Sequence, residues 1–245
     1  MKKLLGAALI AAAAGISGTA LAADAPAPLF NWNGFYTGLS AGYGLGKFKD
    51  LVQRDDDDFH RYDSYKNGQG FLGGAQAGYN WQFGRSLAGI EADFSYSDVN
   101  RTALLTSDDG YQYKSKMEVP WFATLRARVG FLPADQFLLY ATGGLIYGRA
   151  STSRVFTDIG RPLCSGNCSI GTMAENKLSW VLGAGLEYFV SRAVTLKFEY
   201  LYADLGSKSG VHTEDLPSGG ISDFRQFETA SHGLNIFRFG FNYHY

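Results

Sequence analysis

Eight charged residues of this chain stand at alternate positions within otherwise apolar stretches, the spacing that places side chains on one face of a β-strand. They are Glu91, Asp93, Arg126, Arg128, Glu187, Lys197, Glu199 and Arg238. Four are carboxylates and four are cations, so they could neutralise one another if they were buried together. Such a set could form either a charged constriction that filters solutes or a salt-bridged interior that fills a barrel.

Three histidines and two cysteines are the other residues that could do chemistry. His60, His212 and His232 lie in polar segments, where they could ligate haem iron or simply be solvated. Cys164 and Cys168 form an even pair with no good metal ligand between them, which favours a local disulfide. No metal site or resident cofactor is predicted, and hemin remains an optional ligand.

Catalysis finds little support in the sequence. A hydrolase needs a serine, a histidine and a carboxylate within hydrogen-bonding reach, and no G-x-S-x-G, H-E-x-x-H or phosphate-binding motif marks such a set. A lipid-modifying enzyme of the outer membrane is therefore kept only as a minor alternative.

Eight period-two segments would position the charged residues. Apolar and aromatic side chains alternate with small or polar ones in the ranges 32–48, 71–82, 87–97, 117–131, 137–148, 178–190, 194–204 and 235–245. In the last of these, Phe237, Phe239, Phe241, Tyr243 and Tyr245 share one face. Both faces of 137–148 are apolar, and we assign Phe137, Leu139, Ala141, Leu145 and Tyr147 to the outer one.

A bilayer explains these apolar faces better than a second protein layer. Each segment reaches the roughly 9–11 residues that a tilted strand needs to cross the membrane. Short connections alternate with long polar ones at 49–70, 98–116, 149–177 and 205–232. We predict an all-β, eight-stranded antiparallel up-and-down transmembrane β-barrel with short periplasmic turns and long extracellular loops. A barrel of this size encloses only side chains or one small ligand, which favours the filled interior.

The N-terminus predicts export. Lys2 and Lys3 precede an apolar run that ends in an A-x-A pattern at Ala20 to Ala22. The run is too short to span a membrane, so residues 1–22 are predicted to be a cleaved signal peptide and 23–245 the barrel domain. The 22 basic and 23 acidic residues are nearly balanced, which argues against nucleic acid as a partner.

Several motifs together resemble the small outer-membrane β-barrel proteins of alphaproteobacteria, a family described as porin-like, as major surface antigens and in part as hemin-binding. They include W-N-G-F-Y (32–36), A-G-Y-N-W-Q (77–82), G-I-E-A-D-F (89–94), L-R-A-R-V-G (125–130), L-Y-A-T-G-G-L (139–145) and G-A-G-L-E-Y (183–188). The barrel is also similar to the transmembrane domain of outer membrane protein A. The resemblance implies an integral protein of the cell outer membrane whose residues Phe241, Tyr243 and Tyr245 act as the assembly signal.

The same resemblance implies the partners: outer-membrane lipids and lipopolysaccharide, periplasmic chaperones, the outer-membrane assembly machinery and, in a homo-oligomer, further copies of the chain. The predicted function is structural, supporting envelope integrity and surface exposure, with at most a narrow passive pore. The alternatives are a hemin-binding surface receptor and, second, a lipid-modifying enzyme.

Overall fold

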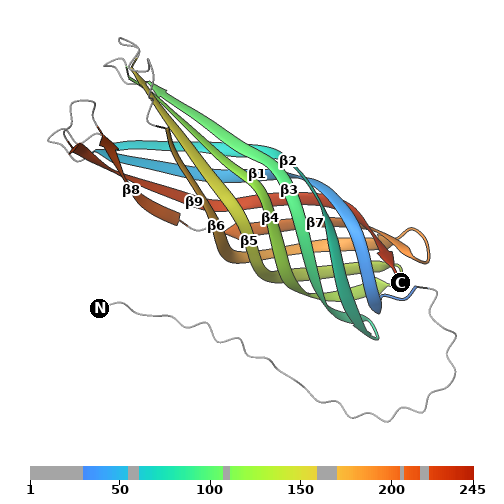
Figure 1. Ribbon diagram of the computed structural model, residues 1–245. Helices are drawn as coiled ribbons and strands as arrows, with labels where there is room; N and C mark the ends of the chain where they lie inside the picture. Colours follow the sequence, from blue (N-terminus) through green and yellow to red (C-terminus); the bar gives the residue numbers. More distant parts are fainter. Residues whose placement is uncertain (1–29, 55–60, 107–110, 159–169, 205–206, 216–220) are drawn as a thin grey trace, which may run out of the picture.

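A computed structural model describes residues 30–54, 61–106, 111–158, 170–204, 207–215 and 221–245 (Figure 1). Its elements are antiparallel strands. They are β1 Gly34–Arg54, β2 Arg61–Phe83, β3 Ser86–Thr106, β4 Tyr111–Ala134, β5 Phe137–Asp158, β6 Ile170–Phe189, β7 Val194–Asp204, β8 Ser207–Asp215 and β9 Ile221–His244. Within these described ranges, no helix is long and apolar enough to cross a membrane.

The sheet closes on itself. Strands β1 to β7 pair in chain order, β7 pairs with β9, and β9 pairs back with β1 from Tyr36↔His244 onward. Strand β7 pairs with the C-terminal half of β9, and β8 pairs with the N-terminal half of β9 in the same register. Strands β7 and β8 together therefore occupy one position in the wall. The predicted eight-stranded antiparallel barrel is thus confirmed.

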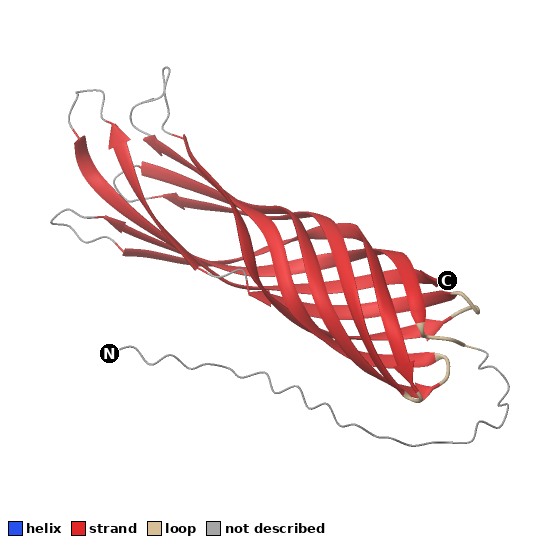
Figure 2. Ribbon diagram, turned by 60° about the horizontal axis from the view of Figure 1, so that its bottom comes forward, coloured by secondary structure: helices blue, strands red, loops and turns tan. Residues whose placement is uncertain are grey.

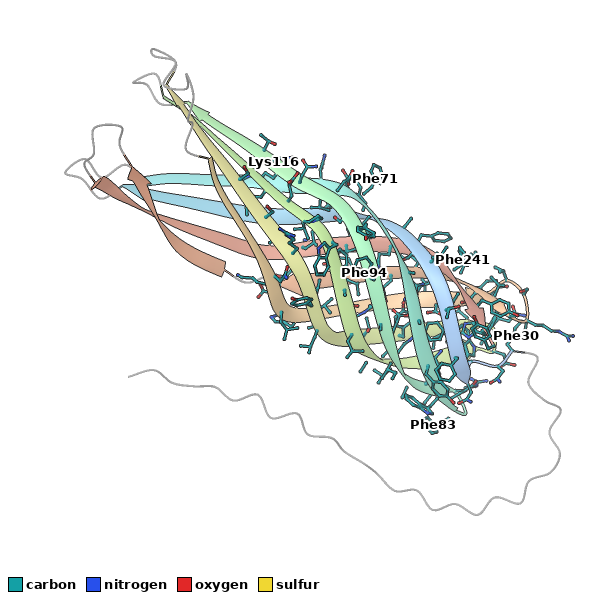
Figure 3. The ribbon with its side chains drawn as sticks, viewed as in Figure 1. Phe30, Phe71, Phe83, Phe94, Lys116 and Phe241 are labelled. Atoms are coloured by element: carbon teal, nitrogen blue, oxygen red, sulfur yellow. The ribbon has the colours of Figure 1, made fainter. Side chains whose placement is uncertain are left out.

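The outer surface of the barrel is apolar, as a lipid-facing wall must be. Phe35, Leu125 and Phe239 are 64%, 60% and 55% exposed, while their neighbours along each strand point inward. Figure 3 shows Phe71, Phe94 and Phe241 on this outer face. In β5, Leu139, Leu145 and Tyr147 are exposed and Leu138, Tyr140 and Ile146 are buried, which is the facing that the sequence analysis assigned.

The strands are much longer than the predicted membrane segments. Pairing of β1 with β2 continues without interruption to Gln53↔Arg61, and β4 pairs with β5 out to Tyr111↔Asp158. The four polar connections were therefore wrongly predicted as long loops, because much of each is paired strand that runs on past the cross-hatched cylinder in Figure 2. Beyond the bilayer no lipid demands an apolar face, so these extensions carry no period-two signal while their backbones still pair.

The opposite end of the barrel has short turns, as predicted. Strands β2 and β3 are joined through Gly84 and Arg85, and Gly84 has a φ of 61°, a conformation that glycine adopts without strain. The chain enters β1 and leaves β9 at this same end (Figure 1). Short turns mark the periplasmic side of outer-membrane barrels, so the long extensions point out of the cell.

Candidate functional site inside the barrel

The barrel interior holds the charged residues in one continuous cluster. We call it the ionic belt, and it consists of Glu91, Asp93, Arg126, Arg128, Glu187, Lys197, Glu199 and Arg238. All eight are buried and come from β3, β4, β6, β7 and β9, so they converge from different parts of the wall. Inward glycines on β1, such as Gly38 and Gly42, leave the room that these long side chains need.

Arg126 connects belt residues of three strands, β3, β4 and β7. Its Nη1 donates to Glu199 Oε1 at 2.9 Å, and its Nη2 donates to Asp93 Oδ2 at 2.9 Å and also to Glu91. Its Nε donates to Thr124 Oγ1 at 2.9 Å. One guanidinium thus joins three carboxylates from two strands, and its planar fork is suited to that geometry.

A second guanidinium, that of Arg238, links two of these carboxylates, Asp93 and Glu199. Arg238 Nη1 donates to Asp93 Oδ1 at 2.9 Å, and its Nε donates to Glu199 Oε2 at 3.1 Å. The hydroxyl of Tyr140 donates to Glu199 Oε1 at 2.9 Å. Glu199 therefore has partners on both oxygens, which compensates for its removal from water.

The periplasmic side of the belt is organised around Glu91 and Arg128. Lys197 Nζ lies 2.7 Å from both oxygens of Glu91, and Tyr36 donates to Glu91 Oε2 at 2.8 Å. Arg128 Nη2 donates to Glu187 Oε1 at 2.9 Å, and its guanidinium carbon lies 4.1 Å from the centre of the Tyr140 ring. The cation is held by charge on one side and by an aromatic face on the other.

The belt is electrically balanced, with four carboxylates, three guanidiniums and one ammonium. Each carboxylate lies within ion-pair distance of at least one cation. An ion that crossed this region would have to break several of these pairs in a medium where unpaired charge is costly. The arrangement can therefore hold the strands together, and it offers no ready path for solutes.

An apolar layer covers the belt on its extracellular side. We call it the outer apolar layer: Leu72, Val99, Val119, Phe122, Ile146, Val181, Leu201, Ala203, Leu234 and Ile236. These buried side chains come from seven strands and pack together in the centre of the barrel. The sequence predicted a salt-bridged interior and gave no expectation of this apolar layer. The apolar inward face of β5, including Ile146, was the signal that could have revealed it.

A second apolar layer closes the periplasmic mouth. This periplasmic plug consists of Trp32, Leu87, Leu132, Leu138, Tyr140 and Phe189, with Phe30 packed against it. Trp32 is fully buried although it precedes the first strand. Its ring lies 4.4 Å from that of Phe189 and 5.7 Å from that of His244, measured between ring centres.

Hydrogen bonds fix Trp32 in this mouth. Its indole Nε1 donates to the backbone oxygen of Asp135 at 2.9 Å, and its backbone N donates to Gln82 Oε1 at 3.2 Å. Gln82 lies beside the β2–β3 turn, Asp135 in the β4–β5 turn and Phe189 at the end of β6. Trp32 therefore contacts all three periplasmic hairpins, a role that strand periodicity could not reveal.

The remaining predicted residues are placed only in part. The backbone of His212 lies in β8 opposite Arg225, and His232 lies in β9 beside a register shift. The side chains of both, and the whole of His60, Cys164 and Cys168, lie outside the described part of the structure. The hemin and disulfide hypotheses thus stay predictions, and so does the signal peptide at residues 1–22. Among the described residues, no group of three or more potential ligands could hold a metal ion.

The residues predicted to form the assembly signal lie at the closing seam of the barrel. Phe241, Tyr243 and Tyr245 are 47%, 47% and 75% exposed on the outer face. The backbone N of Tyr245 donates to the Phe35 oxygen at 3.0 Å, and its hydroxyl lies 3.1 Å from Thr37 Oγ1. The last residue of the chain is thereby anchored to the first strand.

Comparison with known proteins agrees with this architecture. The chain is 36% identical over 222 residues to the 31 kDa outer-membrane immunogenic protein of Brucella melitensis, covering 86% of this chain and 85% of that protein. It is 32% identical to the 22 kDa outer membrane protein of Rhizobium leguminosarum bv. viciae, covering 82% and 76% of the two chains. The crystal structure of the outer membrane protein OprG from Pseudomonas aeruginosa shares the fold, with a TM-score of 0.51 at 13% identity over 89% of this chain and 99% of OprG.

The family described as "Outer membrane protein beta-barrel domain" matches residues 8–244, nearly the whole chain. Together with a closed barrel whose outer face is apolar, this match identifies an integral protein of the outer membrane. The chain belongs to the outer membrane protein beta-barrel domain family and is homologous to the immunogenic outer-membrane proteins of Brucella.

Proposed function

We propose that this protein is a sealed structural barrel that supports the outer membrane and carries a rigid β-sheet extension at the cell surface. The observation that carries the proposal is the three-layered interior: a balanced ionic belt between the outer apolar layer and the periplasmic plug. The belt links five strands by ion pairs, and the two apolar layers keep it out of contact with bulk water. The design favours rigidity over transport.

A passive pore is the competing function, and the interior argues against it. A permeating ion would need to cross two apolar layers, where its hydration shell has no replacement, and then displace paired charges between them. The outer apolar layer alone includes Phe122, Ile146 and Leu234, each with at most 1% exposure. We therefore assign no transport role to the barrel.

Conductance of the purified, refolded protein in planar lipid bilayers tests this proposal. We expect no stepwise ion current at moderate voltage, because both layers exclude hydrated ions. A general porin inserted into the same membrane is the positive control for detection. Regular current steps that require this protein would refute the sealed barrel.

The proposed support of the outer membrane is tested in cells with a deletion strain. A strain that lacks the protein should become more sensitive to detergents and should release periplasmic enzymes, and the intact gene should reverse both effects. Unchanged detergent resistance and retention in the deletion strain would count against structural support. Neither catalysis nor hemin binding enters this proposal, since the relatives are named as outer-membrane proteins, the one from Brucella melitensis as an immunogenic one.

Deleting Tyr245 should reduce the amount of assembled barrel in the outer membrane several-fold. The deletion removes both the terminal aromatic side chain and the backbone hydrogen bond from Tyr245 to Phe35 at the periplasmic end of the seam between β1 and β9. The measurement is the fraction of protein in the outer membrane that migrates as a folded, heat-modifiable species. Tyr245→Phe is the matched control, because it keeps the aromatic end and removes only the hydroxyl next to Thr37. If the deletion variant assembled as well as the intact chain, Tyr245 would not be part of the assembly signal.

A further inference from the structure

We propose that four buried polar side chains beside the ionic belt form an internal water-binding site. They are Ser40 on β1, Gln76 on β2, Ser95 on β3 and Asn242 on β9. These strands are consecutive neighbours in the wall, in the order β9, β1, β2, β3. The four residues are 9%, 4%, 0% and 0% exposed. The site involves different atoms from those of the belt and is independent of the sealed-barrel function.

The two amides form one half of the site. Gln76 and Asn242 both lie opposite Gly38 in the strand registers, one on each side of β1. Across this glycine, Gln76 Nε2 donates to Asn242 Oδ1 at 2.8 Å. The other atom of each amide, Gln76 Oε1 and Asn242 Nδ2, has no hydrogen-bond partner in the protein. One acceptor and one donor of this amide pair are therefore left without a partner in the protein.

The two hydroxyls form the other half. Ser40 and Ser95 both lie opposite Gly74, again one on each side of the glycine-bearing strand. Ser95 Oγ leans over Gly74, where it would lie only 2.7 Å from an added Cβ atom. Neither hydroxyl has a partner in the protein. Since Ser40 follows Gly38 by two positions on the same face, the hydroxyl pair is about 7 Å further along the strand than the amide pair.

Hydration is the arrangement that satisfies all four groups at once. Leaving a buried donor or acceptor without a partner costs about 1–3 kcal/mol, and where the protein supplies no partner an ordered water molecule commonly does. A buried water molecule makes about three hydrogen bonds, so two hydroxyls, one acceptor and one donor suit about two waters. The carboxylate of Asp93, opposite Gln76 in the register, brings the site up to the edge of the belt.

The sign of a stability change separates a hydrated site from a dry one. We expect Ser40→Ala and Ser95→Ala each to increase the unfolding equilibrium constant about tenfold, because each loses hydrogen bonds to bound water. If the hydroxyls were dry, alanine would remove an unsatisfied group and the constant would fall. Urea unfolding of the refolded barrel in lipid vesicles measures this constant. An unchanged or smaller constant for both variants would overturn the proposal.

Ser179→Ala calibrates the measurement. Its hydroxyl is partly buried on β6 and donates to the backbone oxygen of Asp204, so its removal gives the cost of losing a direct hydrogen bond.

The second readout is magnetisation transfer from water to the side-chain amide protons of Gln76 and Asn242, recorded by NMR in nanodiscs. We expect cross-peaks at the water frequency for both amides, weakened in Ser40→Ala. Absence of the cross-peaks from both amides in the intact protein would refute the site.

Discussion

Replacing Arg126 by methionine should lower the free energy of unfolding by about 3–5 kcal/mol, the usual cost of removing one partner from a buried ion pair. The methionine keeps much of the side-chain volume but leaves Glu91, Asp93 and Glu199 with one cation fewer. The remaining cations must then compensate four carboxylates. Equilibrium unfolding in urea, followed by tryptophan fluorescence in lipid vesicles, measures the loss.

The matched control for this change is Arg192→Met in the turn between β6 and β7. Arg192 is exposed, so its replacement should change the free energy of unfolding by no more than about 0.5 kcal/mol. A double-mutant cycle with Glu199→Gln and the variant that carries both changes measures how strongly Arg126 and Glu199 are coupled in the free energy of unfolding. If Arg126→Met were as mild as Arg192→Met, the belt would contribute little to stability and the structural role proposed for it would be wrong.

Trp32→Ala should cost a similar amount, about 3–5 kcal/mol, because it removes a large, fully buried side chain from the periplasmic plug. The loss includes the packing against Phe189 and the indole hydrogen bond to Asp135. Because Trp32 contacts all three periplasmic hairpins, we also expect water to reach the belt from this end. Faster hydrogen exchange of the backbone amides at the β3 and β6 ends would report that access.

Trp81→Ala is the control for Trp32→Ala, because it also removes a tryptophan but takes it from the outer face of the barrel. Trp81 is 41% exposed on the outer face of β2, close to the same end of the barrel. Its loss should weaken contact with lipid and leave the interior intact, so hydrogen exchange inside the mouth should not change. The role assigned to the plug would be untenable if the two tryptophan variants gave the same exchange pattern and the same stability.

The facing of the membrane segments could be predicted from sequence because lipid imposes a strict rule on every second residue. Charge at mid-bilayer depth is costly, so Arg126 and Arg128 had to point inward, and this alone set the register of their strand. In residues 137–148 of β5 both faces are apolar and carry no charge, so this rule does not decide the facing there; Leu145 and Tyr147 were assigned outward. In the structure Arg126 and Arg128 are buried, while Leu145 and Tyr147 are exposed on the outer face.

Features that lipid does not dictate were missed. Gln53 and Tyr111 lie far outside the bilayer, where strand pairing rests on backbone hydrogen bonds that leave no mark on composition. Trp32 precedes the first strand, so its place in the mouth depends on three hairpins that are distant in sequence. The partners of the belt residues likewise follow from closure of the barrel, as with Arg126 and Glu199, which come from β4 and β7.

The uninterrupted pairing of β1 with β2 and of β5 with β6, which carries these hairpins out of the membrane, also constrains how such a surface can change over time. Because successive side chains alternate between the two faces, losing one residue from an arm would turn every later side chain of that arm to the other face. Losing one residue from each arm at equivalent positions, such as Gln53 and Arg61, keeps the pairing intact. We therefore expect length changes in these hairpins to be tolerated when they occur in matched pairs, which would change the height of the surface while the inner wall stays the same.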